Sequence, residues 1–107
     1  MLTHGLAASE AVWPAQVQAL APHYRVVTWD LRGHGRSSPQ PAPCTFADLA
    51  GDLEQVLDSA GIERAVIAGH SAGGVVAMRF ALDHPRRTAA LVLVGTASGC
   101  NARARQF

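Results

Sequence analysis

The amino-acid sequence predicts an α/β domain of three layers, in which helices cover both faces of a parallel sheet. Two observations carry this prediction. Apolar runs alternate with stretches of helical periodicity, in the order strand, helix, strand, helix, strand, helix, strand. The runs are apolar throughout rather than at every second position, which is typical of strands buried on both faces. We therefore expect a four-stranded parallel sheet with helices between the strands, in one domain over residues 1–107.

The first half of the chain is expected to hold two strands around one helix. Residues 1–3 form a short apolar stub, and residues 24–29 are rich in β-branched and aromatic side chains. Residues 9–21 have helical character, and Pro14 suits a first helical position, where no N–H is needed. The apolar side chains of this helix are expected on one face: Trp13, Val17, Leu20 and Ala21. A polar loop over residues 30–38 follows the second strand.

The clearest helix is expected to begin after Thr45. Thr45 can cap its N-terminus, and Asp48 sits near the capping-box position and the positive end of the helix dipole. Gly61 is a good terminator, because glycine readily adopts the left-handed conformation that ends helices. The apolar residues recur at helical spacing: Phe46, Leu49, Ala50, Leu53, Val56, Leu57 and Ala60.

Two further strands are expected on either side of a third helix. Residues 65–68 form an apolar run typical of a buried strand, and residues 72–83 form a helix that Pro85 stops. Residues 89–94 form another continuous apolar strand, and residues 95–107 a loop or tail. Ligands of parallel sheets bind where the strands end, so we expect a site among the turns that follow the strands.

The turn after the third strand carries the pattern Gly69-x-Ser71-x-Gly73. This spacing is typical of a nucleophile elbow, a sharp strand-to-helix turn with a serine at its tip. A Cβ at Gly69 or Gly73 would collide with backbone in so tight a turn. The N–H of Ala72 lies at a helix N-terminus, where donors lack partners and the dipole favours negative charge. The pattern therefore predicts a nucleophile at Ser71 and half of an oxyanion hole at Ala72.

Four motifs together resemble the α/β-hydrolase superfamily: His4-Gly5-Leu6, Asp30-Leu31-Arg32-Gly33-His34-Gly35-Arg36-Ser37, Gly69-His70-Ser71-Ala72-Gly73-Gly74 and His84-Pro85. The resemblance covers nearly the whole chain and is strongest to bacterial esterases, enol-lactonases and cofactor-free perhydrolases. It implies that Ser71 is the nucleophile and that the backbone N–H groups of Leu6 and Ala72 form the oxyanion hole. It also implies that other motif residues shape these turns: His4, Gly5, Gly69, His70, Gly73 and Gly74.

The resemblance further implies an incomplete domain, the nucleophile-elbow half of a hydrolase. The family has further strands before the His-Gly turn, and its catalytic acid and histidine come later than Val94, whereas this sequence ends at Phe107. The whole protein is then expected to hydrolyse a small carboxylic ester or lactone through an acyl-enzyme at Ser71. The isolated chain is expected to be weakly active or inactive.

Residues within the chain are poor substitutes for the missing base and acid. His70 adjoins Ser71, but neighbouring side chains at a tight turn point in different directions, and a base must come within about 3 Å of the hydroxyl. His4 and His34 sit at the expected site edge, where their alternative role is to satisfy loop backbone groups. Asp30 is the one acid candidate at this edge, although the family places this position in a structural loop.

Several features have structural explanations that compete with functional ones. Ser71 could be a simple helix cap, since small polar residues often start helices. Gly73-Gly74 could serve close packing of helix on strand. Gly33-x-Gly35 lacks the third glycine and the helix of a dinucleotide-binding loop. Solvated side chains are expected at His23, His84, Arg32 and Arg36.

Composition argues against several classes of partner. The formal net charge is +1 with no basic cluster, which predicts neither a nucleic-acid nor an anionic-membrane partner. No apolar run approaches the ~20 residues of a membrane helix, and the N-terminus lacks the pattern of a secretory signal. Cys44 and Cys100 show no metal-ligand spacing, and free thiols suit a cytoplasmic protein. We expect no metal and no cofactor.

Two alternatives stay open. The chain could be a non-catalytic fragment or fold remnant, whose unpaired sheet edges would promote self-association. Within the family, the same serine could also serve a cofactor-free perhydrolase or an acyltransferase, because acyl transfer to another acceptor needs the same residues.

Overall fold

The computed structural model describes residues 1–5, 10–32 and 45–96, which form one parallel sheet and its helices. The strands are β1 (Leu2–Thr3), β2 (Thr28–Trp29), β3 (Ala65–His70) and β4 (Thr88–Val94). They lie in the order β2-β1-β3-β4, and every neighbouring pair is parallel. The four-stranded parallel sheet predicted from the sequence is therefore confirmed.

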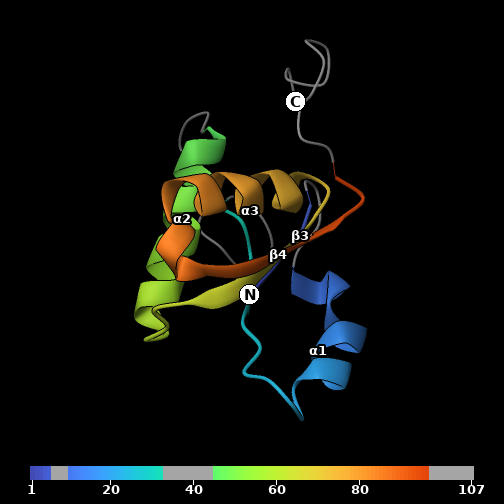
Figure 1. Ribbon diagram of the computed structural model, residues 1–107. Helices are drawn as coiled ribbons and strands as arrows, with labels where there is room; N and C mark the ends of the chain where they lie inside the picture. The colour runs from blue at the N-terminus through green and yellow to red at the C-terminus, as the bar shows by residue number, and fades with distance from the viewer. Residues whose placement is uncertain (6–9, 33–44, 97–107) are drawn as a thin grey trace.

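The helices form layers on the two sides of this sheet (Figure 1). They are α1 (Pro14–Leu20), α2 (Phe46–Ser59) and α3 (Ala72–Asp83), with short 3-10 turns at Glu10–Val12 and Pro85–Arg87. In Figure 1, α2 and α3 cross each other on one side of the sheet and α1 lies on the other. The three-layer arrangement is thus confirmed.

The core lies between the sheet and the pair formed by α2 and α3. Apolar side chains from both helices and from β3 are fully excluded from solvent there, among them Leu53, Leu57, Ile67, Val76 and Phe80. Leu53 and Leu57 belong to the helical spacing that the sequence predicts for α2. Burial of such large side chains supplies most of the stability that fixes the orientation of α3.

The N-terminus of α2 is closed by a capping box. Thr45 Oγ1 accepts a hydrogen bond from the Asp48 N–H at 3.1 Å, and Asp48 Oδ2 accepts one from the Thr45 N–H at 2.8 Å. The bond from the Thr45 backbone, and then that with its side chain, lowers the pKa of the Asp48 carboxyl below its ordinary value. Gly61 adopts a φ of +70° two residues after the helix. Both predicted ends of α2 are confirmed.

The N-terminal third of the chain is less regular than predicted. The helix expected over residues 9–21 is divided into a 3-10 turn and α1, which begins at Pro14 and buries no side chain. The strand expected over residues 24–29 is reduced to Thr28–Trp29. Its only ladder partner in the described chain is β1, which has two residues, so a longer strand would have nothing to pair with.

The prediction that the strands are buried on both faces is wrong for β4. Its apolar side chains from Leu91 to Val94 are 37% to 50% exposed, and Val66 on β3 is 47% exposed. In the described chain, β4 is one of the two edge strands, and α1 contributes no buried side chain on the second face. The apolar sequence of β4 thus predicts a burial that the described residues do not provide.

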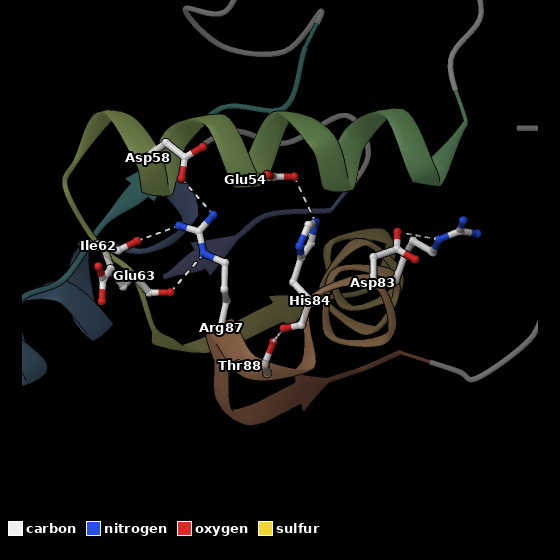
Figure 2. Close-up of polar contacts among 9 residues, drawn as sticks. Glu54, Asp58, Ile62, Glu63, Asp83, His84, Arg87 and Thr88 are labelled. Atoms are coloured by element: carbon white, nitrogen blue, oxygen red, sulfur yellow. Dashed lines mark hydrogen bonds and ion pairs between the residues drawn. The ribbon is translucent and has the colours of Figure 1, made fainter.

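The link between α2 and β3 is held by one arginine (Figure 2). The guanidinium of Arg87 donates to the carbonyl oxygens of Ile62 at 2.7 Å and Glu63 at 2.9 Å. It also pairs with Asp58 at 2.8 Å. Arg87 therefore fastens the end of α2 and the start of β3 to the segment that leads into β4.

His84 also has partners, so the solvated position expected for it is wrong. Its Nε2 lies 2.9 Å from Glu54 Oε2 on α2, as Figure 2 shows. Its ring stacks at 4.9 Å on that of Phe80, and its carbonyl oxygen accepts a hydrogen bond from Thr88 Oγ1 at 3.1 Å. The residue joins α2 to the end of α3.

Candidate active site

Ser71 occupies the turn between β3 and α3 in a backbone conformation that few residues adopt. Its φ is 55° and its ψ −120°, and among the described residues it is the one non-glycine residue with a positive φ. Such a conformation costs on the order of 1–3 kcal/mol and persists only where the surrounding structure imposes it. The strand thereby passes into a helix through a single residue, whose side chain is left exposed.

Glycines remove the side chains that this turn has no room for. A Cβ on Gly69 would overlap the carbonyl group of Gly73, and one on Gly73 would overlap the carbonyl oxygens of Thr3 and His4. These obstacles are backbone atoms and cannot rotate away, so a larger residue at either position would force the chains apart. The first turn of α3 therefore lies directly against the end of β1.

The Ser71 hydroxyl does not cap the helix. Ser71 stands at the N-cap position of α3, yet its side chain makes no capping hydrogen bond. Thr45 at the same position of α2 does make one. The explanation of Ser71 as a simple cap therefore fails.

Two backbone segments converge on Ser71. Ala72 is the first residue of α3, where the N–H has no partner within the helix and lies at the positive end of the dipole. From the other side comes Gly5, whose Cβ position would be 3.2 Å from Ser71 Cβ. Leu6, whose N–H is the second predicted donor, lies outside the described residues.

His4 is fully buried and bonds to the backbone of two loops. The N–H of Leu31 donates to its Nε2 at 2.9 Å, so that nitrogen carries no proton. Its Nδ1 is therefore the protonated nitrogen, and it donates to the carbonyl oxygen of Gly5 at 2.7 Å. Asp30 Oδ1 lies 3.9 Å from Nε2, too far for a hydrogen bond. This arrangement favours the loop-bracing role over a role as base.

His70 is exposed and flanks the serine without bonding to it. Its Nδ1 lies 3.6 Å from the Cβ position of Gly5, and its Nε2 lies 3.6 Å from that of Gly95. The ring thus lies between the turns that follow β1 and β4. In the described part of the chain, no histidine is hydrogen-bonded to the Ser71 hydroxyl.

Thr96 is a contact of Ser71 that sequence reasoning missed. Its Oγ1 donates to the Ser71 carbonyl oxygen at 2.7 Å. No spacing rule links a threonine after β4 to a serine on another strand.

Asp30 and Arg32 belong to a different region, between the end of β2 and α2. A cavity of about 650 Å³ is lined there by Trp29, Asp30, Arg32, Asp52 and neighbouring residues of α2, and none of its lining residues belongs to the Ser71 turn. Arg32 donates two bonds to the Asp52 carboxylate, each 2.7 Å long. The Arg32 side chain is thus paired with a carboxylate while 36% of it stays exposed, and this cavity is not where Ser71 would meet a substrate.

Several predicted features fall outside the described residues. They are Leu6, Gly33, His34, Gly35, Arg36, Cys44 and Cys100. Within the described ranges, no group of three or more His, Cys, Asp or Glu side chains is placed to hold a metal ion. No helix there has both the length and the apolar character that crossing a membrane requires.

Known proteins are similar to this chain in sequence and in fold. A family model described as alpha/beta hydrolase fold matches residues 1–105. RutD of Caulobacter vibrioides, which carries the name of a carbamate hydrolase, is 45% identical over 95 residues, 88% of this chain and 35% of that protein.

Solved structures agree over nearly the whole chain. A thermophilic esterase from Thermogutta terrifontis superposes with a TM-score of 0.93 at 34% identity, over 98% of this chain and 39% of the esterase. The enol-lactonase of Burkholderia xenovorans LB400 gives a TM-score of 0.86 at 36% identity, over 90% of this chain and 37% of the lactonase. The chain thus spans about a third of the length of the proteins it matches.

Proposed function

Because the chain belongs to the α/β-hydrolase fold family, we propose that it carries the nucleophile of a serine hydrolase. The Ser71 hydroxyl attacks the carbonyl carbon of a carboxylic ester or lactone and forms an acyl-enzyme. An ester releases its alcohol in this step, whereas a lactone opens and keeps the freed hydroxyl on the acyl group. Water then attacks the acyl-enzyme, which releases the acid and regenerates the serine.

One observation carries this proposal: the exposed, non-capping hydroxyl of a serine held at a positive φ. A residue in ordinary structural use would not retain such a conformation, because a glycine in its place would be less strained. Strain of this kind is concentrated at functional sites, where it aims a side chain at a substrate.

The oxyanion hole is proposed at the two backbone segments that converge on Ser71. The Ala72 N–H would stabilise the negative charge that develops on the carbonyl oxygen, and the Leu6 N–H is the proposed second donor. A Cβ placed on Gly5 would lie only 3.2 Å from Ser71 Cβ. This closeness supports an approach of the turn after β1 to the reacting carbon. The proton transfers need a histidine and an acid, which we place outside the described residues.

The names of the similar proteins support a substrate class rather than a substrate. Carbamate hydrolase, esterase and enol-lactonase each name cleavage at a carbonyl carbon that bears a heteroatom. All such reactions pass through a tetrahedral oxyanion. We therefore propose a small molecule with an activated carbonyl. An acceptor other than water would make the same site a perhydrolase or acyltransferase.

A second candidate is a fold remnant without catalysis. The exposed apolar strand β4 favours it, since an uncovered edge strand promotes self-association rather than a stable enzyme. The two candidates differ in one property, which is the reactivity of Ser71.

A fluorophosphonate probe tests this reactivity in the 107-residue chain. Imidazole is added as an external general base, and the modified residue is identified by peptide mass spectrometry. We expect an adduct at Ser71, formed at least about tenfold faster than at Ser59, an exposed serine at the end of α2. Ser71→Ala should abolish the adduct. Equal labelling of Ser71 and Ser59 would contradict the role of Ser71 as a nucleophile and favour a fold remnant without catalysis.

A further inference from the structure

The end of β4 holds the backbone of Ser71 from both sides. The Ser71 N–H donates to the carbonyl oxygen of Val94 at 3.0 Å. The Ser71 carbonyl oxygen accepts from Thr96 Oγ1 at 2.7 Å and from the Gly74 N–H at 2.9 Å. The bonds to Val94 and Gly74 are backbone bonds that any sequence could make. The bond from Thr96 is the one that depends on a side chain.

The first turn of α3 leaves room for that side chain. A Cβ on Gly74 would lie 2.6 Å from both Cβ and Cγ2 of Thr96, and 2.7 Å from its Oγ1. Gly95, with a φ of +57°, turns the chain at the end of β4 immediately before Thr96. The absence of a side chain at Gly74 and the turn at Gly95 together bring the hydroxyl to the Ser71 carbonyl.

The bonded carbonyl belongs to the same peptide group as the Ala72 N–H. A peptide group is planar and trans, so its C=O and N–H point in opposite directions and rotate together. Any bond that fixes the Ser71 carbonyl therefore also fixes the direction of the Ala72 N–H. The hydroxyl of Thr96 thus acts on the proposed oxyanion donor through a rigid group.

We propose that Thr96 is a positioning residue that aims the Ala72 N–H at the oxyanion and holds Ser71 in its strained conformation. This inference rests on the proposed role of Ser71 as the nucleophile. Its effect should appear in the chemical step rather than in binding, because an oxyanion donor contributes most when charge has developed.

The experiment measures covalent labelling of the full chain by the fluorophosphonate probe, with imidazole added. The dependence of the labelling rate on probe concentration separates the maximal labelling rate from the apparent affinity for the probe. Thr96→Val, which removes the hydroxyl but keeps the shape, should lower the maximal rate about tenfold and leave the affinity unchanged. Thr96→Ser, which restores a hydroxyl, should return the rate to within about threefold of the unchanged chain.

Thr88→Val is the matched control. Thr88 Oγ1 also donates to a backbone carbonyl, that of His84 at 3.1 Å, but this bond lies at the opposite end of β4. The Thr88→Val substitution should leave the maximal labelling rate unchanged. If Thr96→Val proves unfolded by circular dichroism, Thr96→Ala replaces it in the same comparison.

The outcomes separate the inference from the function on which it rests. An unchanged maximal rate in Thr96→Val, with labelling still confined to Ser71, overturns the positioning role and leaves the nucleophile in place. A rate in Thr96→Ser as low as in Thr96→Val also overturns it, because packing rather than the hydroxyl would then matter. Absence of Ser71 labelling in the unchanged chain contradicts the proposed function itself.

Discussion

At residue 71 the local conformation and the exposed hydroxyl make opposite demands on the amino-acid type. The φ of 55° and ψ of −120° suit glycine, whereas the chemistry proposed for the turn needs a hydroxyl. The neighbouring backbone settles this conflict through the bonds to Val94 and Gly74 and the side-chain bond from Thr96. Stability is therefore given up at one position in favour of a side chain that no helix or strand requires.

Ser71→Gly should be more stable than Ser71→Ala by about 1 kcal/mol, although both lack the hydroxyl. Glycine relieves the strain of a positive φ, while alanine retains it, and the greater flexibility of glycine in the unfolded chain offsets part of the gain. Urea denaturation followed by circular dichroism measures the difference. Equal stability of the two variants would mean that the backbone at residue 71 is not strained.

At the scale of elements, α2 combines a defined start, a defined end and a buried apolar face. The capping box closes one end, Gly61 closes the other, and the face between them contributes Leu53 and Leu57 to the core. Arg87 then fastens the end of this helix, and the loop that follows it, to the segment that leads into β4. The helix on which α3 rests is thus held at both ends.

The capping box makes the stability of α2 dependent on pH. Hydrogen bonds from Thr45 lower the folded-state pKa of Asp48 below its unfolded value. The stabilisation is therefore present above the ordinary aspartate pKa and is lost as the pH falls through the lowered folded value. Urea midpoints at neutral pH and at about pH 3 should differ less in Asp48→Asn, which can still accept the Thr45 bond but does not titrate.

Other carboxylates also titrate in this range, so the informative quantity is the difference between the two proteins. Thr45→Ala serves as the companion variant, because it removes the hydroxyl that accepts from the Asp48 N–H and should cost about 1 kcal/mol at neutral pH. An identical pH dependence in Asp48→Asn and the unchanged chain would contradict this role of the capping box.

At the scale of the whole molecule, the two sides of the sheet are unequally covered. The side that carries α2 and α3 contains the core, whereas the side chains from Leu91 to Val94 on the edge strand β4 are substantially exposed. A seven-residue apolar edge strand offers backbone groups and side chains to another copy of itself. We therefore expect the isolated chain to self-associate.

Val92→Lys should shift the chain toward monomer, because a charge on an edge strand opposes pairing with a second sheet. Leu82→Lys is the control, since Leu82 is 80% exposed but lies on α3. Sedimentation velocity over a range of micromolar concentrations measures both. Association through β4 would be contradicted if the chain without substitutions is a monomer, or if the two substitutions have equal effects.

Local signals are sufficient for α2 and for the Ser71 turn, because caps, glycines and periodicity are encoded in consecutive residues. They fail for β2, whose length is set by the two residues of its partner strand rather than by its own composition. They fail for the exposure of β4, which depends on what packs against it. They also miss Thr96, which is 25 positions from Ser71 and reaches it only through the order of the strands.

The strand order has a consequence for synthesis of the chain. β1 is made before β2 and β3 but lies between them in the sheet, where Leu2 is paired with Thr28 on one side and with Ala68 on the other. A ribosome must therefore release the chain well beyond Ala68 before this strand gains its second neighbour. Closing so long a loop is slow compared with forming a helix. The nascent protein consequently carries β1 paired only with β2 until β3 emerges, and during that interval one edge of β1 is open to proteases and chaperones.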